Sequence, residues 1–559
     1  MATRIILFLL AMVIGLPSTN AQPSAVKKAA KSVFSLTTYN ADGTIRSSSH
    51  GVFAGNNGEA IAMWHPFMGA ARAVVIDSKG RQYDVDAMLG VSENYDLCKF
   101  RVKGNADGGV GLNFTTDNSV ASQVFLVGYD TKKPVIKSVA PLRTEKFMTN
   151  FNYYVFKDED VSGSMLGCPV VGSNGQLLGI VQRPENGGEA FSSDARLTMT
   201  FKLNGLSIND QTLRATGIRT ALPADEKDAS VMLVLASSVS DSTRYNEYID
   251  DYIRSFPAAT DGYNARATQF VNLGMLAMAD DMLQTEVKKS AKKDVAYANY
   301  SSLVYQASIY RVDTTFTKWN LAKAYDLACE AYKLNPLPAY QHQQAQVLFA
   351  QNKYQKALDL LATLRKTDIG KTGEIFYEAA QCKVRLNAPK TEIMALLDSA
   401  VNVQPRIQSA PYVLARGRQY DAYGDYRKAF FDYLKYDSLS NFNSTADFYY
   451  VKFKCEMKIK QYQLALNDIA HAIVLNRAEP VYYAEMASLQ LRVNKLEDAV
   501  KTCDLAFTIK GTDKMSDFYV IKGIALCEMK QKAQGLEALG KAKELGDSRA
   551  DGLIKKYSK

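Results

Sequence analysis

The chain has 559 residues, of which 47% are hydrophobic and 22% charged, and its formal net charge is +9. This composition is that of a globular protein and excludes disordered, collagen-like and disulfide-dense chains. The positive charge is spread thinly along the sequence, so we expect neither a nucleic-acid partner nor attachment to a membrane surface. The length suggests about three or four domains, or two if one of them is a repeat array.

The N-terminus predicts export. Arg4 precedes an apolar run from Ile5 to Leu16, and small and polar residues continue to Ala21. This pattern is typical of a secretory signal peptide over residues 1–21, cleaved after Ala21, and indicates a periplasmic or secreted protein. The alternative is a buried N-terminal helix. A run of about a dozen apolar residues is too short to cross a bilayer, and no longer run follows, so no membrane span is expected.

From about residue 30 to 222 the sequence alternates short β-type runs with turn residues, which predicts a barrel or sandwich. Pairs such as Asp42-Gly43, Lys79-Gly80 and Asn174-Gly175 supply turns. Examples of the expected strands are 32–39, 51–54, 60–63, 73–76, 122–127, 152–156 and 177–181.

Residues 50–54, 59–65 and 95–102 of this β region carry motifs that resemble those of trypsin-like serine peptidases of the high-temperature-requirement type. Residues 50–54, His-Gly-Val-Phe-Ala, and 59–65, Glu-Ala-Ile-Ala-Met-Trp-His, are similar to the segments that lead to the family's catalytic histidine. Residues 95–102, Tyr-Asp-Leu-Cys-Lys-Phe-Arg-Val, are similar to the strand that follows the family's acid. The resemblance implies an all-β double barrel over residues 22–222, with His65 as catalytic base and Asp96 as the acid that orients it.

A further segment, residues 161–171, resembles the nucleophile loop but lacks its serine. In register on Gly167 and Pro169, the nucleophile position holds Leu166, which cannot be acylated. Two replacements are open, Ser164 and Cys168, each two residues away. In extended chain that is about 6–7 Å, too far for a hydrogen bond to His65 unless the loop is remodelled. A triad-like remnant of His65, Asp96 and Ser164 is therefore expected.

Beyond about residue 225 the pattern is helical and repeats itself. Alanines in similar contexts at 357, 429, 465 and 499 are separated by 72, 36 and 34 residues. Less regular marks fit at Ala279 and Gly535, and a small residue lies twelve positions before five of the marks, at 267, 345, 417, 487 and 523. The spacing resembles the tetratricopeptide repeat, a helix pair of about 34 residues. We expect a connecting helix or linker over 223–242 and an all-α tetratricopeptide solenoid over 243–559.

Seven scattered cysteines and four histidines form no Cys-x-x-Cys or Cys/His cluster, so neither a disulfide framework nor a metal site is expected. His342 and His471 lie on the repeat helices as surface or packing residues. Phosphate-binding and dinucleotide-binding glycine motifs are missing from the sequence, and no cofactor is expected.

The prediction is thus a multidomain, exported scaffold. A trypsin-like domain without its nucleophile precedes a repeat array whose groove binds a protein or peptide partner. The alternative is an active serine endopeptidase that uses a displaced Ser164 with His65 and Asp96 and recruits substrates through the repeats. A purely structural spacer is a third possibility.

Overall fold

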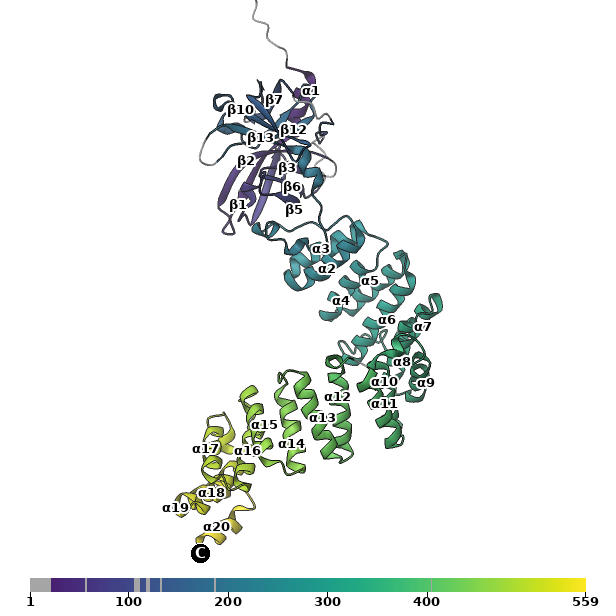
Figure 1. Cartoon of the computed structure of the whole chain (residues 1–559), viewed down its shortest axis with the longest axis vertical. Coiled ribbons are helices and arrows are strands. Elements are labelled where there is room, and N and C mark those ends of the chain that lie inside the picture. The colour runs from purple at the N-terminus through teal and green to yellow at the C-terminus, as the bar shows by residue number, and fades with distance from the viewer. Residues whose placement is uncertain are drawn as a thin grey trace, which may run out of the picture. The chain divides into compact units, whose positions relative to one another are not determined.

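The computed structural model describes residues 22–55, 58–104, 111–116, 121–130, 133–184, 188–403 and 405–559. The predicted signal peptide, residues 1–21, lies outside the described residues, so its cleavage and the export of the chain stay predictions. Contacts divide the chain into two compact units, Met1–Lys292 and Lys293–Lys559. The first contains the strands and the first helices, and the second is helical (Figure 1).

The first six strands form a closed antiparallel barrel in the order β1–β2–β3–β6–β5–β4. Strand β1 closes it by pairing with both β2 and β4. Phe34, Phe53 and Phe100 fill the interior with other buried apolar side chains, as alternating strands require. The strands are β1 (Val33–Tyr39), β2 (Ile45–Phe53), β3 (Glu59–Ala62), β4 (Arg72–Asp77), β5 (Gln82–Ser92) and β6 (Leu97–Val102).

The next seven strands form one sheet in the order β8–β7–β11–β12–β13–β10–β9. The expected double barrel is therefore not confirmed, because in the described residues β8 and β9 end this sheet without pairing with each other. Strand β9 has the charged, exposed side chains typical of a protected edge. The strands are β7 (Val124–Asp130), β8 (Lys133–Val139), β9 (Arg143–Phe147), β10 (Phe151–Phe156), β11 (Pro169–Val171), β12 (Leu177–Gln182) and β13 (Ala190–Asp194).

In the described residues, the first unit has five α-helices. Asp225 and Asp241 cap α2 and α3 by accepting hydrogen bonds from backbone N–H groups of the first turn, which is why these helices begin where they do. Helix α3 buries Tyr248, Ile249 and Tyr252 on one face. The helices are α1 (Ser24–Ala29), α2 (Glu226–Val239), α3 (Ser242–Ser255), α4 (Asp261–Asn272) and α5 (Leu276–Lys289).

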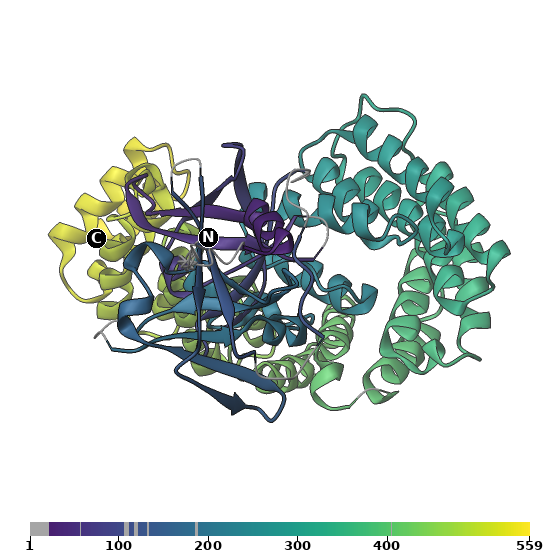
Figure 2. The same cartoon turned by 90° about the horizontal axis from the view of Figure 1, so that it is seen from above.

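The second unit is a succession of helix pairs followed by a last helix. Its helices are labelled α6 to α20 in Figure 1, and Figure 2 shows the green ones side by side. Its helices are α6 (Lys293–Tyr310), α7 (Leu321–Leu334), α8 (Pro338–Ala350), α9 (Tyr354–Leu364), α10 (Gly373–Arg385), α11 (Lys390–Val403), α12 (Ala410–Ala422), α13 (Tyr426–Leu439), α14 (Ala446–Lys458), α15 (Tyr462–Leu475), α16 (Pro480–Arg492), α17 (Leu496–Ala506), α18 (Ser516–Glu528), α19 (Lys532–Glu544) and α20 (Ala550–Ser558).

The repeat marks of the sequence have one structural meaning. The four register alanines at 357, 429, 465 and 499 are fully buried. The residue five positions before each of them has a φ between 59° and 75°: Asn352, Gly424, Lys460 and Asn494. A left-handed residue at this place ends one helix and turns the chain into the next. The period therefore corresponds to a repeated helix–turn–helix unit.

Small residues in the first helix of a pair allow the second to approach closely. At Gly523 a Cβ would lie 2.7 Å from Leu539 Cγ and 2.9 Å from the Gly535 carbonyl oxygen. Neither neighbour is a flexible chain end, so α18 and α19 can pack at this distance only around a glycine.

All seven cysteines are free thiols, five of them buried. Among the described residues, no helix has the length and apolar character that crossing a membrane requires.

Candidate functional site

The structure brings His65 and Asp96 together at one end of the barrel. His65 begins a short 3₁₀ helix (His65–Phe67) after β3, and Asp96 immediately precedes β6, the strand that pairs with β3. Asp96 Oδ1 accepts a hydrogen bond of 2.6 Å from the His65 backbone N–H. The Trp64 backbone N–H donates to the Asp96 carbonyl oxygen at 3.2 Å. The carboxylate therefore braces the backbone on which the exposed imidazole stands.

A buried glutamine of the second sheet holds the Asp96 turn. Asp96 has a φ of 45°, a conformation that a non-glycine residue rarely adopts. Gln182 Nε2, at the end of β12, donates to the carbonyl oxygens of Tyr95 at 2.9 Å and of Asp96 at 2.7 Å. Ser193 Oγ fixes the amide by donating to Gln182 Oε1 at 2.8 Å. Sequence reasoning missed Gln182, whose signal is a polar residue that ends an otherwise apolar strand.

The segment that resembles the nucleophile loop is folded inward at Leu166. A 3₁₀ turn (Gly163–Met165) precedes Leu166, whose half-buried side chain packs against an apolar cluster of the second sheet. The Leu166 backbone N–H donates to the Gly163 carbonyl oxygen at 3.3 Å, and so it closes the turn. In a serine peptidase the N–H at this position holds the oxyanion.

Ser164 and Cys168, the two replacements considered from the sequence, lie in different environments. Ser164 is exposed, and its Oγ lies 2.9 Å from Ser162 Oγ. Cys168 is fully buried, and burial raises the pKa of its thiol to about 12. A thiol with that pKa is not ionised at neutral pH, so Cys168 is a packing residue and not an activated nucleophile.

His50 lies next to this loop. The sequence analysis treated His50 only as the first residue of the motif at 50–54. The half-buried ring hydrogen-bonds to the Leu166 backbone, and burial lowers its pKa more than this bond raises it. Gly167 has a φ of 81°, and a Cβ there would lie 2.5 Å from the His50 carbonyl oxygen. Strand β2 and the loop thus touch directly, which keeps the loop close to the barrel.

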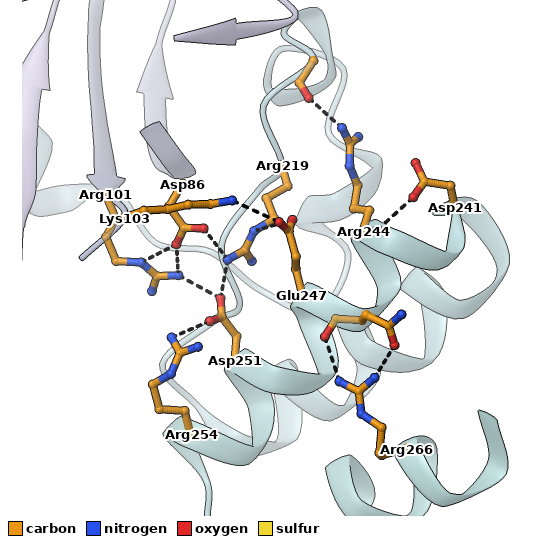
Figure 3. A network of polar contacts seen from close by, with 12 residues as sticks. Asp86, Arg101, Lys103, Arg219, Asp241, Arg244, Glu247, Asp251, Arg254 and Arg266 are labelled. Carbon is orange, nitrogen blue, oxygen red and sulfur yellow. Dashed lines mark hydrogen bonds and ion pairs between the residues drawn. The ribbon is translucent and has the colours of Figure 1, made fainter. Parts of the chain in front are cut away.

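A network of ion pairs joins the barrel to α3 (Figure 3). Arg219 donates to Asp86 Oδ1 at 2.8 Å and to Asp251 Oδ2 at 2.7 Å, and Arg101 bonds to the same two carboxylates. The side chains of Arg219 and Asp251 are only 4% and 5% exposed. Burial raises the pKa of Asp86, but the two guanidinium groups overcome this and the net shift is downward.

A cavity of about 620 Å³ opens beside this network. Its charged lining residues balance in number, four acidic and four basic: Asp86, Arg101, Lys103, Arg219, Glu247, Asp250, Asp251 and Arg254. These opposite charges pair with one another beside the cavity. We therefore interpret the network as a structural clamp that holds α3 to the barrel.

The second unit contains a buried charged cluster on α13, α14 and α15. Lys452 Nζ lies 3.0 Å from Asp437 Oδ2 and 3.1 Å from Asp468 Oδ2. Glu456, one turn after Lys452, is 1% exposed. Burial, reinforced by the charge of Asp468, raises the pKa of Glu456 to about 9. Glu456 is therefore a neutral acid at pH 7.

No protein-family model and no curated protein matches the chain. Two similar solved structures are a serine endoprotease from Yersinia pestis and the HtrA-type protease AlgW solved with a tripeptide. The first is 18% identical over 36% of this chain and 68% of its own, with a TM-score of 0.28. The second is 17% identical over 31% of this chain and 60% of its own, with a TM-score of 0.26. At these values, the likeness carries no conclusion about activity.

Proposed function

We propose that this chain is an exported scaffold in which a trypsin-like domain without peptidase activity is joined to a tetratricopeptide array that binds a protein or peptide. The observation that carries the proposal is the loop at Leu166. An alkyl side chain stands where acylation requires a hydroxyl or thiol, and the backbone N–H that would hold the oxyanion closes a turn instead.

The retained histidine and acid do not restore the reaction by themselves. A base accelerates acyl transfer by accepting the proton of a nucleophile within about 3 Å. Ser164 is engaged with Ser162, and Cys168 is buried as a thiol. Loss of a triad member costs about 10⁶-fold in turnover by analogy with removal of the serine or histidine of a working triad. We infer that the β domain contributes recognition or structure rather than hydrolysis.

The helical pairs support partner binding. A cavity of about 280 Å³ opens among α6, α8 and α10, the first helices of three successive pairs. Tyr305, Phe349 and Tyr377 line it together with the polar side chains of Gln346, Gln381 and Arg385. Aromatic walls with a few polar groups are typical of ligand-binding pockets.

A fluorophosphonate probe tests the proposal on the full chain. The probe reacts with a serine only when a base and an oxyanion site activate it, so we expect no labelling of the wild-type protein. Ser164→Ala and its neighbour Ser162→Ala form a matched pair. If the wild type is labelled, and the labelling is lost in Ser164→Ala but kept in Ser162→Ala, the chain is an active endopeptidase and the scaffold proposal is wrong.

A further inference from the structure

The second unit brings three metal-type ligands to one place between α8 and α10. His342 lies on α8, and Glu374 and Glu378 lie one turn apart on α10. One ligand atom of each residue lies within 4.8 Å of the other two. His342 Nε2 is 2.6 Å from Glu378 Oε2. No local motif marks this cluster, because 32 residues separate His342 from Glu374 and only the packing of the helices brings them together.

The cluster is partly enclosed and oriented. The His342 and Glu378 side chains are 16% and 22% exposed. Gln346, one turn after His342, donates from Nε2 to Glu378 Oε1 at 2.9 Å. A hydrogen bond of this kind fixes a carboxylate that binds a metal with its other oxygen. Glu378 and Gln346 also line the 280 Å³ cavity described above, so one side of the cluster faces open space.

The electrostatics of the cluster favour a cation. The carboxylates of Glu374 and Glu378 both lie beside the His342 ring. With a neutral imidazole, the three residues carry two negative charges.

We propose that His342, Glu374 and Glu378 form a binding site for a divalent transition metal of the zinc type. One imidazole and two carboxylates are a ligand set that zinc accepts, with bonds of about 2.0–2.2 Å, and three protein ligands leave a fourth position open. Bonds of that length separate neighbouring ligand atoms by about 3.3–3.5 Å in a tetrahedral site. The three ligand atoms already lie within 4.8 Å of one another, and Glu378 also lines the cavity.

The competing account is an ion pair between His342 and Glu378 with no ligand. Titration of the full chain with zinc distinguishes the two. We expect one equivalent to bind tightly and His342→Ala to lose it. His471→Ala is the matched control, because His471 is an exposed histidine of the same helical unit. Glu378→Gln, which keeps the side-chain shape, should also lose the site, and Gln346→Ala should weaken it by about 10–100-fold.

A second readout uses cobalt in place of zinc. A four-coordinate site with imidazole and carboxylate ligands gives intense visible absorption, and this absorption should disappear in His342→Ala and persist in His471→Ala. Circular dichroism of each variant verifies that the helices remain folded. Zinc binding of equal affinity in the wild type, His342→Ala and Glu378→Gln, or no bound equivalent in the wild type, would overturn the site. Neither readout depends on partner binding by the array.

Discussion

Glu456 offers a quantitative test of how the helical unit is built. Its carboxyl is buried on α14 beside Asp468 and has a pKa of about 9, against 4.5 for an exposed glutamate. In the unfolded chain the group ionises above pH 4.5, whereas in the folded chain it stays protonated. The folded state therefore binds more protons between the two values, and its stability falls as the pH rises through that window.

The magnitude follows from the same two values. At pH 7 ionisation favours the unfolded chain by about 3 kcal/mol, since each pH unit above 4.5 contributes about 1.4 kcal/mol. Glutamine has nearly the same shape and does not ionise, and its amide can donate to Asp468. Glu456→Gln should therefore raise the free energy of unfolding by about 3 kcal/mol at pH 7 and change it little near pH 4.5.

Urea unfolding followed by far-ultraviolet circular dichroism measures this difference, since the helices dominate the signal. The midpoint of Glu456→Gln should lie roughly 1 M above that of the wild type at neutral pH. The exposed Glu537→Gln is the matched control, with little change at any pH. A Glu456→Gln midpoint equal to or below that of the wild type at pH 7, or a gain of the same size at every pH, would refute a neutral Glu456.

Three further predictions address other parts of the chain. Asp251→Asn should lower the stability of the first unit by about 3 kcal/mol in thermal unfolding, because it leaves buried Arg219 with one carboxylate fewer. Asp250→Asn, at an exposed position, should cost less than about 1 kcal/mol. Equal losses of stability in the two variants would contradict the clamp. Gly523→Ala should destabilise the pair α18 and α19. Gly540→Ala, where a Cβ meets nothing within 4 Å, should stabilise the pair by up to about 1 kcal/mol. A change of the same sign in the free energy of unfolding of both variants would contradict close packing at α18. Mass spectrometry of the exported chain should give an N-terminus at Gln22, and an intact residue 1 would contradict the predicted signal peptide.

Local patterns predicted the elements well, because strands and helix turns are coded by neighbouring residues. The expected run 177–181 lies inside β12, and the repeated context around Ala357 marks a left-handed turn at Asn352. Whether the second sheet closes into a barrel could not be predicted, because that depends on whether edge strands such as β9 pair with another strand. These strands are short and charged, and the pattern of a strand does not specify its neighbour.

The candidate site also combines features that the sequence predicts with contacts that it does not specify. The family resemblance singled out His65 and Asp96, but the bond from the His65 backbone N–H to the Asp96 carboxylate is a contact that a motif does not specify. Gln182 reaches the Asp96 turn across 86 residues, and Glu378 reaches His342 across 36. Such pairs arise when elements pack, so they leave no periodic signal in the chain.

The central claim is that the β domain does not cleave peptide bonds, and incubation of the full chain with an unfolded protein tests it most directly. Mass spectrometry of the products should show no new N-termini beyond those formed with the Ser164→Ala variant. New termini that appear with the wild type and vanish with Ser164→Ala would contradict the account and identify a working peptidase.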